Sequence, residues 1–104
     1  MFDYLDFEEV PGKDTGKDLK LLALSTCGFC KRAKAFLKEF GLAYKVIDVD
    51  GLDKSIRLRI REDFSSLKGK AVTYPTLMIG EDDYLTGFIR PLWMNTLGLE
   101  EQDD

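Results

Sequence analysis

The sequence has 104 residues, of which 44% are hydrophobic, so it is long enough for one domain with its own core. Its net charge of −4 comes from the two ends, because residues 1–18 and 99–104 are acidic while residues 19–98 carry more bases than acids. No apolar run approaches the roughly 18 residues of a membrane span, and no basic region precedes an apolar stretch at the N-terminus. The sequence therefore predicts neither a membrane segment nor a signal peptide, and we expect no nucleic-acid partner.

Residues 1–18 are predicted to form an acidic N-terminal extension. Four large apolar residues occur in it at irregular spacing: Phe2, Tyr4, Leu5 and Phe7. Pro11, Gly12 and Gly16 then indicate a turn and a linker. The sequence leaves open whether this extension frays or docks its aromatic side chains on the domain that follows.

The first half of that domain, which spans residues 19–98, is predicted to form a β-α-β unit. Residues 19–24 include a single charge and are typical of a buried strand. Residues 28–40 follow helical spacing, and Gly41 can serve as the C-terminal cap. Residues 44–49 contain valine and isoleucine, which are good strand formers.

The second half is predicted to add a helix, a hairpin and a final helix. Asp50 can cap a helix over residues 52–64, where a parallel β-x-β connection needs covering structure. A loop over residues 65–73 leads to strands at 76–79 and 84–86, which a turn at 80–83 joins. Pro91 suits the first turn of a last helix, which Gly98 ends. The predicted order is β-α-β-α-β-β-α, followed by an acidic tail over residues 99–104.

The only two cysteines of the chain, Cys27 and Cys30, lie where the first strand ends and the first helix begins. The unpaired N–H groups of a helix N-terminus stabilise a thiolate, and a cysteine there has a pKa of roughly 3.5–7.5 instead of about 8.5. Cys27 is expected to be exposed at the cap, and Cys30 to lie one turn inside. This arrangement predicts a redox dithiol in which one thiol attacks and the other resolves.

Two other interpretations of the cysteine pair are weaker. A structural zinc site usually needs four Cys or His ligands, and the chain has no His and no third Cys, so we expect no metal site. The second interpretation is a pair of inert core thiols, which is less favoured still. A structural disulfide is also unfavourable, because one between Cys27 and Cys30 closes too short a loop to stabilise a fold. A working dithiol is typical of a reducing compartment, so we expect a cytoplasmic protein.

The Tyr74-Pro75 pair stands directly before the predicted third strand. The peptide bond can be an ordinary trans bond or a cis bond, which costs only about 0.5–1 kcal/mol before proline. Three cations follow the dithiol, namely Lys31, Arg32 and Lys34. They can serve solubility alone, or attract an anionic substrate or an acidic partner.

Over residues 19–98 the chain resembles the glutaredoxins, small members of the thioredoxin superfamily. The resemblance rests on Cys27-Gly28-Phe29-Cys30, on Thr73-Tyr74-Pro75 and on Gly87-Phe88, in this order and spacing. It implies a thioredoxin-like α/β fold with a four-stranded mixed sheet flanked by three helices, and a cis bond before Pro75. It also implies that Cys27 and Cys30 are catalytic and that substrate is bound by the following residues: Thr73, Tyr74, Pro75, Gly87, Phe88 and Lys31.

The chain departs from the glutaredoxin pattern at two places. Many glutaredoxins carry a lysine three residues before the first cysteine, where this chain has Leu24. They also follow the last strand with a group that holds the γ-glutamyl end of glutathione, whereas here Ile89 and Arg90 follow Gly87-Phe88. That stretch is similar to one in redoxins reduced by thioredoxin reductase. The monothiol glutaredoxins, which share an iron–sulfur cluster between subunits, have a serine where this chain has Cys30.

The resemblance implies a monomeric thiol–disulfide oxidoreductase that reduces disulfides of proteins or small molecules. We expect it to need no cofactor, with glutathione as a possible co-substrate, and to take electrons from thioredoxin reductase or from glutathione. The alternative is a binding module in which two chains share a [2Fe–2S] cluster through their Cys27 thiolates and glutathione.

Overall fold

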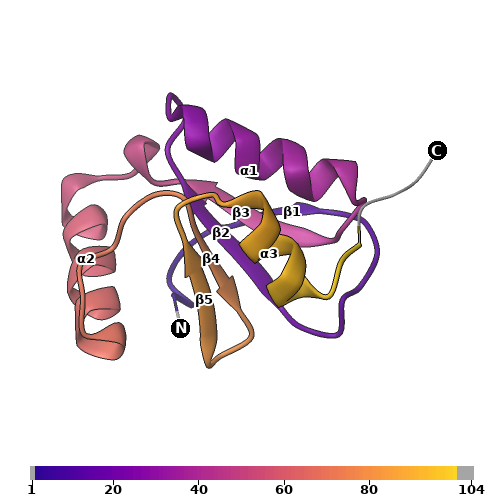
Figure 1. The fold of residues 1–104 in the computed structure, drawn as a ribbon. Coiled ribbons are helices and arrows are strands. Elements are labelled where there is room, and N and C mark those ends of the chain that lie inside the picture. Colours follow the sequence, from indigo (N-terminus) through magenta and orange to yellow (C-terminus); the bar gives the residue numbers. More distant parts are fainter. Residues whose placement is uncertain (1, 101–104) are drawn as a thin grey trace.

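The computed structural model describes residues 2–100. Its five strands form one mixed sheet in the order β1-β3-β2-β4-β5 (Figure 1). β2 and β3 pair in parallel, and the other neighbours pair antiparallel. The parallel pair is the β-α-β unit that the sequence predicts. The strands are β1 (Glu8–Val10), β2 (Leu19–Ala23), β3 (Tyr44–Asp48), β4 (Thr76–Ile79) and β5 (Asp83–Thr86).

Three helices cover the two faces of this sheet, and their order along the chain is the predicted one. α1 (Gly28–Glu39) and α3 (Arg90–Leu97) share one hydrophobic cluster with alternate residues of the strands, such as Leu21 and Leu77. α2 (Lys54–Lys68) packs on the other face, against the intervening residues Leu22 and Met78. The alternation of β2 and β4 between two cores explains why both strands are almost wholly apolar. None of the helices within residues 2–100 is long and apolar enough to cross a membrane.

The prediction of four strands is wrong by one, because β1 lies in the N-terminal extension. β1 pairs antiparallel with β3, with Glu8 opposite Val46 and Val10 opposite Tyr44. Three residues of which two are glutamates give no strand signal in the sequence. They form a strand because β3 would otherwise present an unpaired edge.

The extension docks on the domain along most of its length. Phe2 and Leu5 are buried in the same cluster as α2. Gly12 lies so close to the α1–β3 turn that a Cβ atom there would approach the carbonyl oxygen of Gly41 to 2.5 Å. The extension therefore docks on the domain and does not fray.

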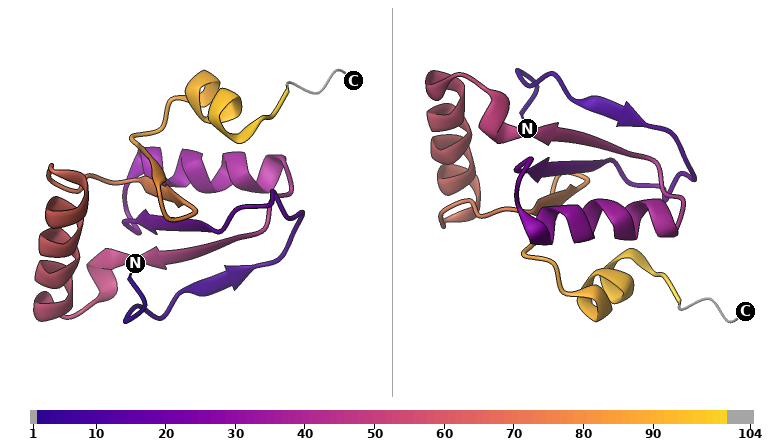
Figure 2. Two further views of the ribbon diagram at one scale, coloured as in Figure 1. Left: turned by 90° about the horizontal axis from the view of Figure 1, so that it is seen from below. Right: turned by 90° about the horizontal axis from the view of Figure 1, so that it is seen from above.

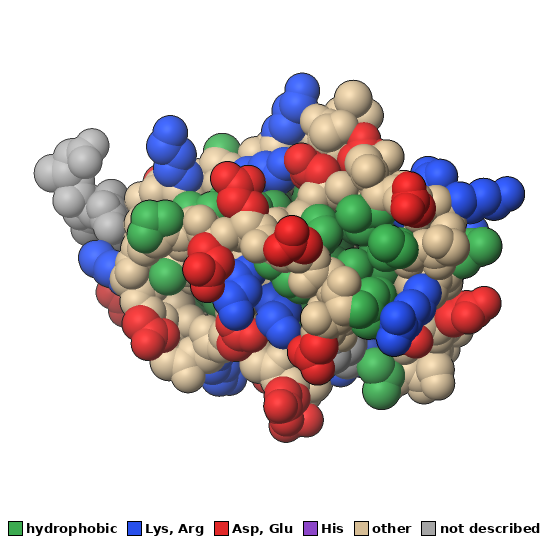
Figure 3. Space-filling model, turned by 180° about the vertical axis from the view of Figure 1, so that it is seen from behind, with side chains coloured by type: hydrophobic (Ala, Val, Ile, Leu, Met, Phe, Trp, Pro, Cys, Tyr) green, Lys and Arg blue, Asp and Glu red, His purple; other side chains and the backbone are tan. Residues whose placement is uncertain are grey.

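Figure 3 shows the face of the molecule opposite to the view of Figure 1. On this face acidic and basic side chains are interspersed and do not form one charged patch.

The second helix differs from its predicted bounds at both ends. A short 3₁₀ turn over Val49–Gly51 precedes it, so α2 begins at Lys54, with Asp53 at the cap. Asp50 does not cap this helix, because its carboxylate accepts a hydrogen bond from the backbone N–H of Ser25 at 3.0 Å. At its other end α2 continues through half of the predicted loop to Lys68. It ends at Gly69, whose φ of 73° is the left-handed conformation that glycine adopts readily.

Candidate active site

The two cysteines occupy the junction of β2 and α1 that the sequence predicts. Cys27 is the N-cap residue of α1, and its Sγ accepts a hydrogen bond from the backbone N–H of Cys30 at 3.3 Å. Cys30 lies inside the first turn and is fully buried, whereas Cys27 is partly exposed. The backbone N–H of Leu24 donates to Cys30 Sγ at 3.3 Å, which fixes the buried sulfur against the end of β2. Both cysteines are free thiols in this structure.

The electrostatic environments of the two thiols are opposite. The pKa of Cys27 is lowered, chiefly by a hydrogen bond from the Cys30 side chain and further by the backbone N–H groups of Cys30 and Phe29. Burial is the main cause that raises the pKa of Cys30 to about 11, and the hydrogen bond to Cys27 adds to it. The site therefore favours the thiolate form at the accessible Cys27 and the protonated form at the buried Cys30.

The cis bond between Tyr74 and Pro75 is confirmed. Tyr74 packs against the hydrophobic cluster that contains Cys30. Burial raises the pKa of the Tyr74 phenol, and charge on Cys30 raises it further while Arg61 lowers it. Thr73, the next residue back, contacts the hydroxyl of Thr86 through its own hydroxyl.

The third predicted motif, which lies in the loop between β5 and α3, joins the same site. The backbone N–H of Gly87 donates to the carbonyl of Pro75 at 2.9 Å, and the Gly87 carbonyl accepts from Trp93 Nε1 at 2.9 Å. Phe88 packs on Phe36 of α1, with ring centroids 5.4 Å apart. The loops that carry the second and third motifs are thus hydrogen-bonded to each other, and both pack on the core around Cys30.

Of the cations beside the dithiol, Lys34 has a defined partner. It forms an ion pair with Asp48 of β3 at 2.8 Å. Arg32 lies over the exposed ring of Phe29, 5.4 Å from its centroid. Lys31 is exposed on α1, and its role in substrate binding stays a prediction.

A cavity of about 310 Å³ adjoins the dithiol loop, and the sequence analysis missed it. Leu24 and Tyr74 form its wall on the dithiol side, and α2 supplies most of the rest. We name it the α2 cavity; its full lining is Leu24, Val49, Asp50, Lys54, Arg57, Leu58, Arg61 and Tyr74. The lining holds three cations and one carboxylate, so it suits a ligand with an acidic group. The signal in the sequence was the four-residue spacing of Arg57 and Arg61, which places them on one flank of a helix.

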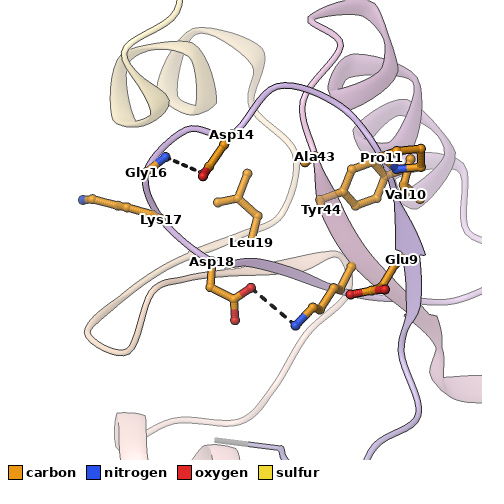
Figure 4. A pocket seen from close by; sticks show the side chains of 11 residues that line it. Glu9, Val10, Pro11, Asp14, Gly16, Lys17, Asp18, Leu19, Ala43 and Tyr44 are labelled. Carbon is orange, nitrogen blue, oxygen red and sulfur yellow. Dashed lines mark hydrogen bonds and ion pairs between the residues drawn. The ribbon is translucent and has the colours of Figure 1, made fainter.

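A larger cavity, of about 720 Å³, lies away from the dithiol (Figure 4). Its lining includes Leu19, at the start of β2, whereas Cys27 follows the far end of that strand. The loop that precedes β2 arches over it, and the side chains of Asp14, Asp18 and Lys17 surround it (Figure 4). This mixture of charges lies at the opposite end of the sheet from the two cysteines.

Comparisons with known proteins agree with this geometry. The family model described as Glutaredoxin matches residues 17–83. A glutaredoxin from Methanosarcina mazei Go1 is 25% identical, with a TM-score of 0.75 over 89% of this chain and 88% of that one. Methanoredoxin from Methanosarcina acetivorans is also 25% identical, with a TM-score of 0.73 over 85% and 90%.

A further solved structure, glutaredoxin grx-1 from Archaeoglobus fulgidus, is 29% identical, with a TM-score of 0.66 over 76% of this chain and 84% of that one. No curated protein matches the chain. The likeness to these three structures confirms the predicted thioredoxin-like fold.

Proposed function

The chain belongs to the glutaredoxin family, and from this premise we propose that it is a thiol–disulfide oxidoreductase that uses Cys27 as nucleophile and Cys30 as resolving thiol. One observation carries the proposal: an accessible sulfur with a lowered pKa stands at the N-cap of α1, and a buried thiol stands one turn away. A thiolate is the attacking species in disulfide exchange, and only Cys27 has both the charge and the access for that role.

The reaction needs two exchange steps. The Cys27 thiolate attacks one sulfur of a substrate disulfide, which forms a mixed disulfide and releases the other substrate sulfur as a thiolate that takes up a proton. Cys30 then loses its proton and attacks Cys27 Sγ, and the second substrate thiol leaves. Two electrons pass to the substrate, and the protein is left with a Cys27–Cys30 disulfide. An external thiol reductant restores the two thiols by the reverse exchange.

Substrate is proposed to lie across the three loops that meet at the dithiol. Thr73, Tyr74 and Pro75 would present backbone groups to a substrate cysteine, and Gly87 and Phe88 would border it on the other side. The hydrogen bond from Gly87 to Pro75 supports this assignment, because it holds the two loops in a fixed relation. Lys31 would attract an anionic substrate from the exposed face of α1.

The α2 cavity is proposed to receive an acidic group of a small disulfide. Arg57→Gln should raise the KM for dithiodipropionate, a disulfide with two carboxylates, by about fivefold, the effect of losing one solvent-exposed charge pair. The KM for the neutral bis(hydroxyethyl) disulfide should stay the same, as should kcat for both. Steady-state kinetics with the two substrates measures this difference.

Lys68→Gln is the matched control for Arg57→Gln, since it removes one cation from the same helix outside the lining of the cavity. Equal changes of KM for the charged and the neutral disulfide, or equal effects of the two variants, would refute the assignment of the cavity.

Glutathione should be a slower electron donor than a dithiol protein. Leu24 replaces a cation near the cysteines, and Ile89 and Arg90 after Phe88 provide no acid for a γ-glutamyl ammonium. Arg57 and Arg61 can supply the first missing contact, but the ammonium contact, worth roughly 1.5–3 kcal/mol, stays absent. We expect an initial rate about tenfold lower with glutathione than with thioredoxin reductase and NADPH, or with another dithiol protein.

The donor experiment uses oxidised protein and matched thiol concentrations. A rate with glutathione equal to or above the rates with dithiol donors would show that this chain is reduced as an ordinary glutathione-dependent glutaredoxin. Failure of every donor to reduce the disulfide, at a measured Cys27–Cys30 disulfide content, would count against the oxidoreductase itself.

A further inference from the structure

The first residues of the chain hold α2 by polar as well as apolar contacts. The Tyr4 hydroxyl donates to Asp63 Oδ2 at 2.7 Å, and the Arg59 guanidinium lies over the Tyr4 ring, 3.7 Å from its centroid. Phe2 and Leu5, on either side of Tyr4, are buried against the cluster that contains Ile60. Phe2 shares this cluster with Ile47 of β3 and Met78 of β4. Both views in Figure 2 show the chain passing on from this segment into β1, which runs beside β3.

These contacts and the α2 cavity lie on opposite flanks of the same helix. At about 100° per residue, the buried residues Ile60 and Phe64 mark the stripe that faces the sheet. Arg59 and Asp63 fall on one side of this stripe, where Tyr4 contacts them. The cavity-lining residues Arg57 and Arg61 fall on the other side. A rotation of α2 about its axis would therefore move both flanks together.

The other contacts of α2 are less directional than the hydrogen bond between Tyr4 and Asp63. The stripe is apolar, and apolar contacts are not directional. Asp53 at the N-cap makes no side-chain capping hydrogen bond, so the end of α2 nearest the cavity lacks that anchor. The pKa of Tyr4 is raised by burial and by the hydrogen bond to Asp63, so its phenol remains a donor at neutral and mildly alkaline pH. The hydrogen bond between Tyr4 and Asp63 is thus a directional constraint on the helix.

We infer that Tyr4 is a positioning residue for substrate binding: it fixes the rotation of α2 and so places Arg57 and Arg61 to meet the acidic group of a disulfide substrate. The inference rests on the proposed function of the α2 cavity. It assigns to the N-terminal segment a part in selecting anionic over neutral substrates, although this segment does not line the cavity.

The test compares Tyr4→Phe, which keeps the ring under Arg59 and removes the hydroxyl, with Tyr84→Phe. Tyr84 is a matched control, because its ring packs edge-on to Phe64 of the same helix at 5.4 Å and it does not line the cavity. Tyr4→Phe should raise the KM for dithiodipropionate about fivefold and leave its kcat and both constants for bis(hydroxyethyl) disulfide unchanged. Tyr84→Phe should change none of them. An unchanged KM in Tyr4→Phe, or an equal rise for both substrates, would overturn the inference.

A triple variant decides whether Tyr4 acts through the two arginines of the cavity. If it does, adding Tyr4→Phe to the pair Arg57→Gln and Arg61→Gln should leave the KM for dithiodipropionate close to that of the pair alone. A further multiplication of the KM by Tyr4→Phe would mean that Tyr4 acts independently of these arginines, against the inference.

Hydrogen exchange gives a readout that needs no activity. The backbone amides of residues 58–61 should exchange faster in Tyr4→Phe than in the unsubstituted protein, and equal rates would overturn the positioning role. If the unsubstituted protein reduces neither disulfide, the proposed function fails, and the exchange rates still decide the contact between Tyr4 and α2.

Discussion

Replacing Cys27 with serine should reduce disulfide exchange to the uncatalysed background, whereas Cys30→Ser should accumulate mixed disulfides with the substrate. The first step needs only an accessible thiolate, and the site favours this form at Cys27, the N-cap residue of α1, whose pKa is lowered. A serine hydroxyl at position 27 cannot form the mixed disulfide. In Cys30→Ser the attack by Cys27 still occurs, but no second protein thiol is present to release the product.

Mass spectrometry of the protein after mixing with a disulfide separates the two variants. Cys30→Ser should gain the mass of one substrate half on Cys27, and Cys27→Ser should gain none. Ser25→Ala is a suitable control, because it changes a hydroxyl in the same loop and leaves both cysteines in place. Retention of substantial reductase activity in Cys27→Ser would show that the nucleophile has been assigned to the wrong sulfur.

The sequence predicts the position of the two cysteines well because its determinants are local. A buried strand, a Cys-x-x-Cys spacing and a helical stripe are each set by neighbouring residues, so the placement of Cys27 and Cys30 at the strand–helix junction follows from the sequence alone. The cis bond at Pro75 followed from the resemblance to a family, since sequence alone allows either isomer. Its contact with Gly87 depends on two loops that meet only after the sheet has formed.

The missed features all depend on contacts between distant segments. β1 exists because the edge of β3 is available, although its own sequence is unfavourable for a strand. The α2 cavity was missed because arginines on a helix do not by themselves indicate whether they face a cavity or open solvent. Their relation to Leu24 and Tyr74 depends on how α2 sits against the sheet. The docking of Tyr4 on Asp63 joins residues that are 59 positions apart, a separation over which sequence patterns carry no information.

Cys27 should react with iodoacetamide at pH 6 at least about tenfold faster than Cys30. The pKa of Cys30 is raised to about 11 and that of Cys27 is lowered, so at pH 6 far more of Cys27 is thiolate. A thiolate of lower pKa is intrinsically less nucleophilic, which offsets about half of this advantage on a logarithmic scale. Burial of Cys30 lowers its labelling rate further, because the reagent must reach the sulfur. Labelling followed by peptide mass analysis gives both rates, and faster labelling of Cys30 would reverse the roles of the two thiols.

The pH dependence of this reaction tests the cause of the lowered pKa. The alkylation rate of Cys27 should rise with pH up to its pKa and stay constant above it, since only the thiolate reacts. The largest cause of the lowered pKa is the hydrogen bond from the Cys30 side chain. Cys30→Ala removes that donor, so the pH at which the rate becomes constant should move upward. The backbone N–H groups of Phe29 and residue 30 remain in this variant and should keep the pKa of Cys27 below that of a free thiol. An unshifted profile in Cys30→Ala would mean that the helix N-terminus alone stabilises the thiolate.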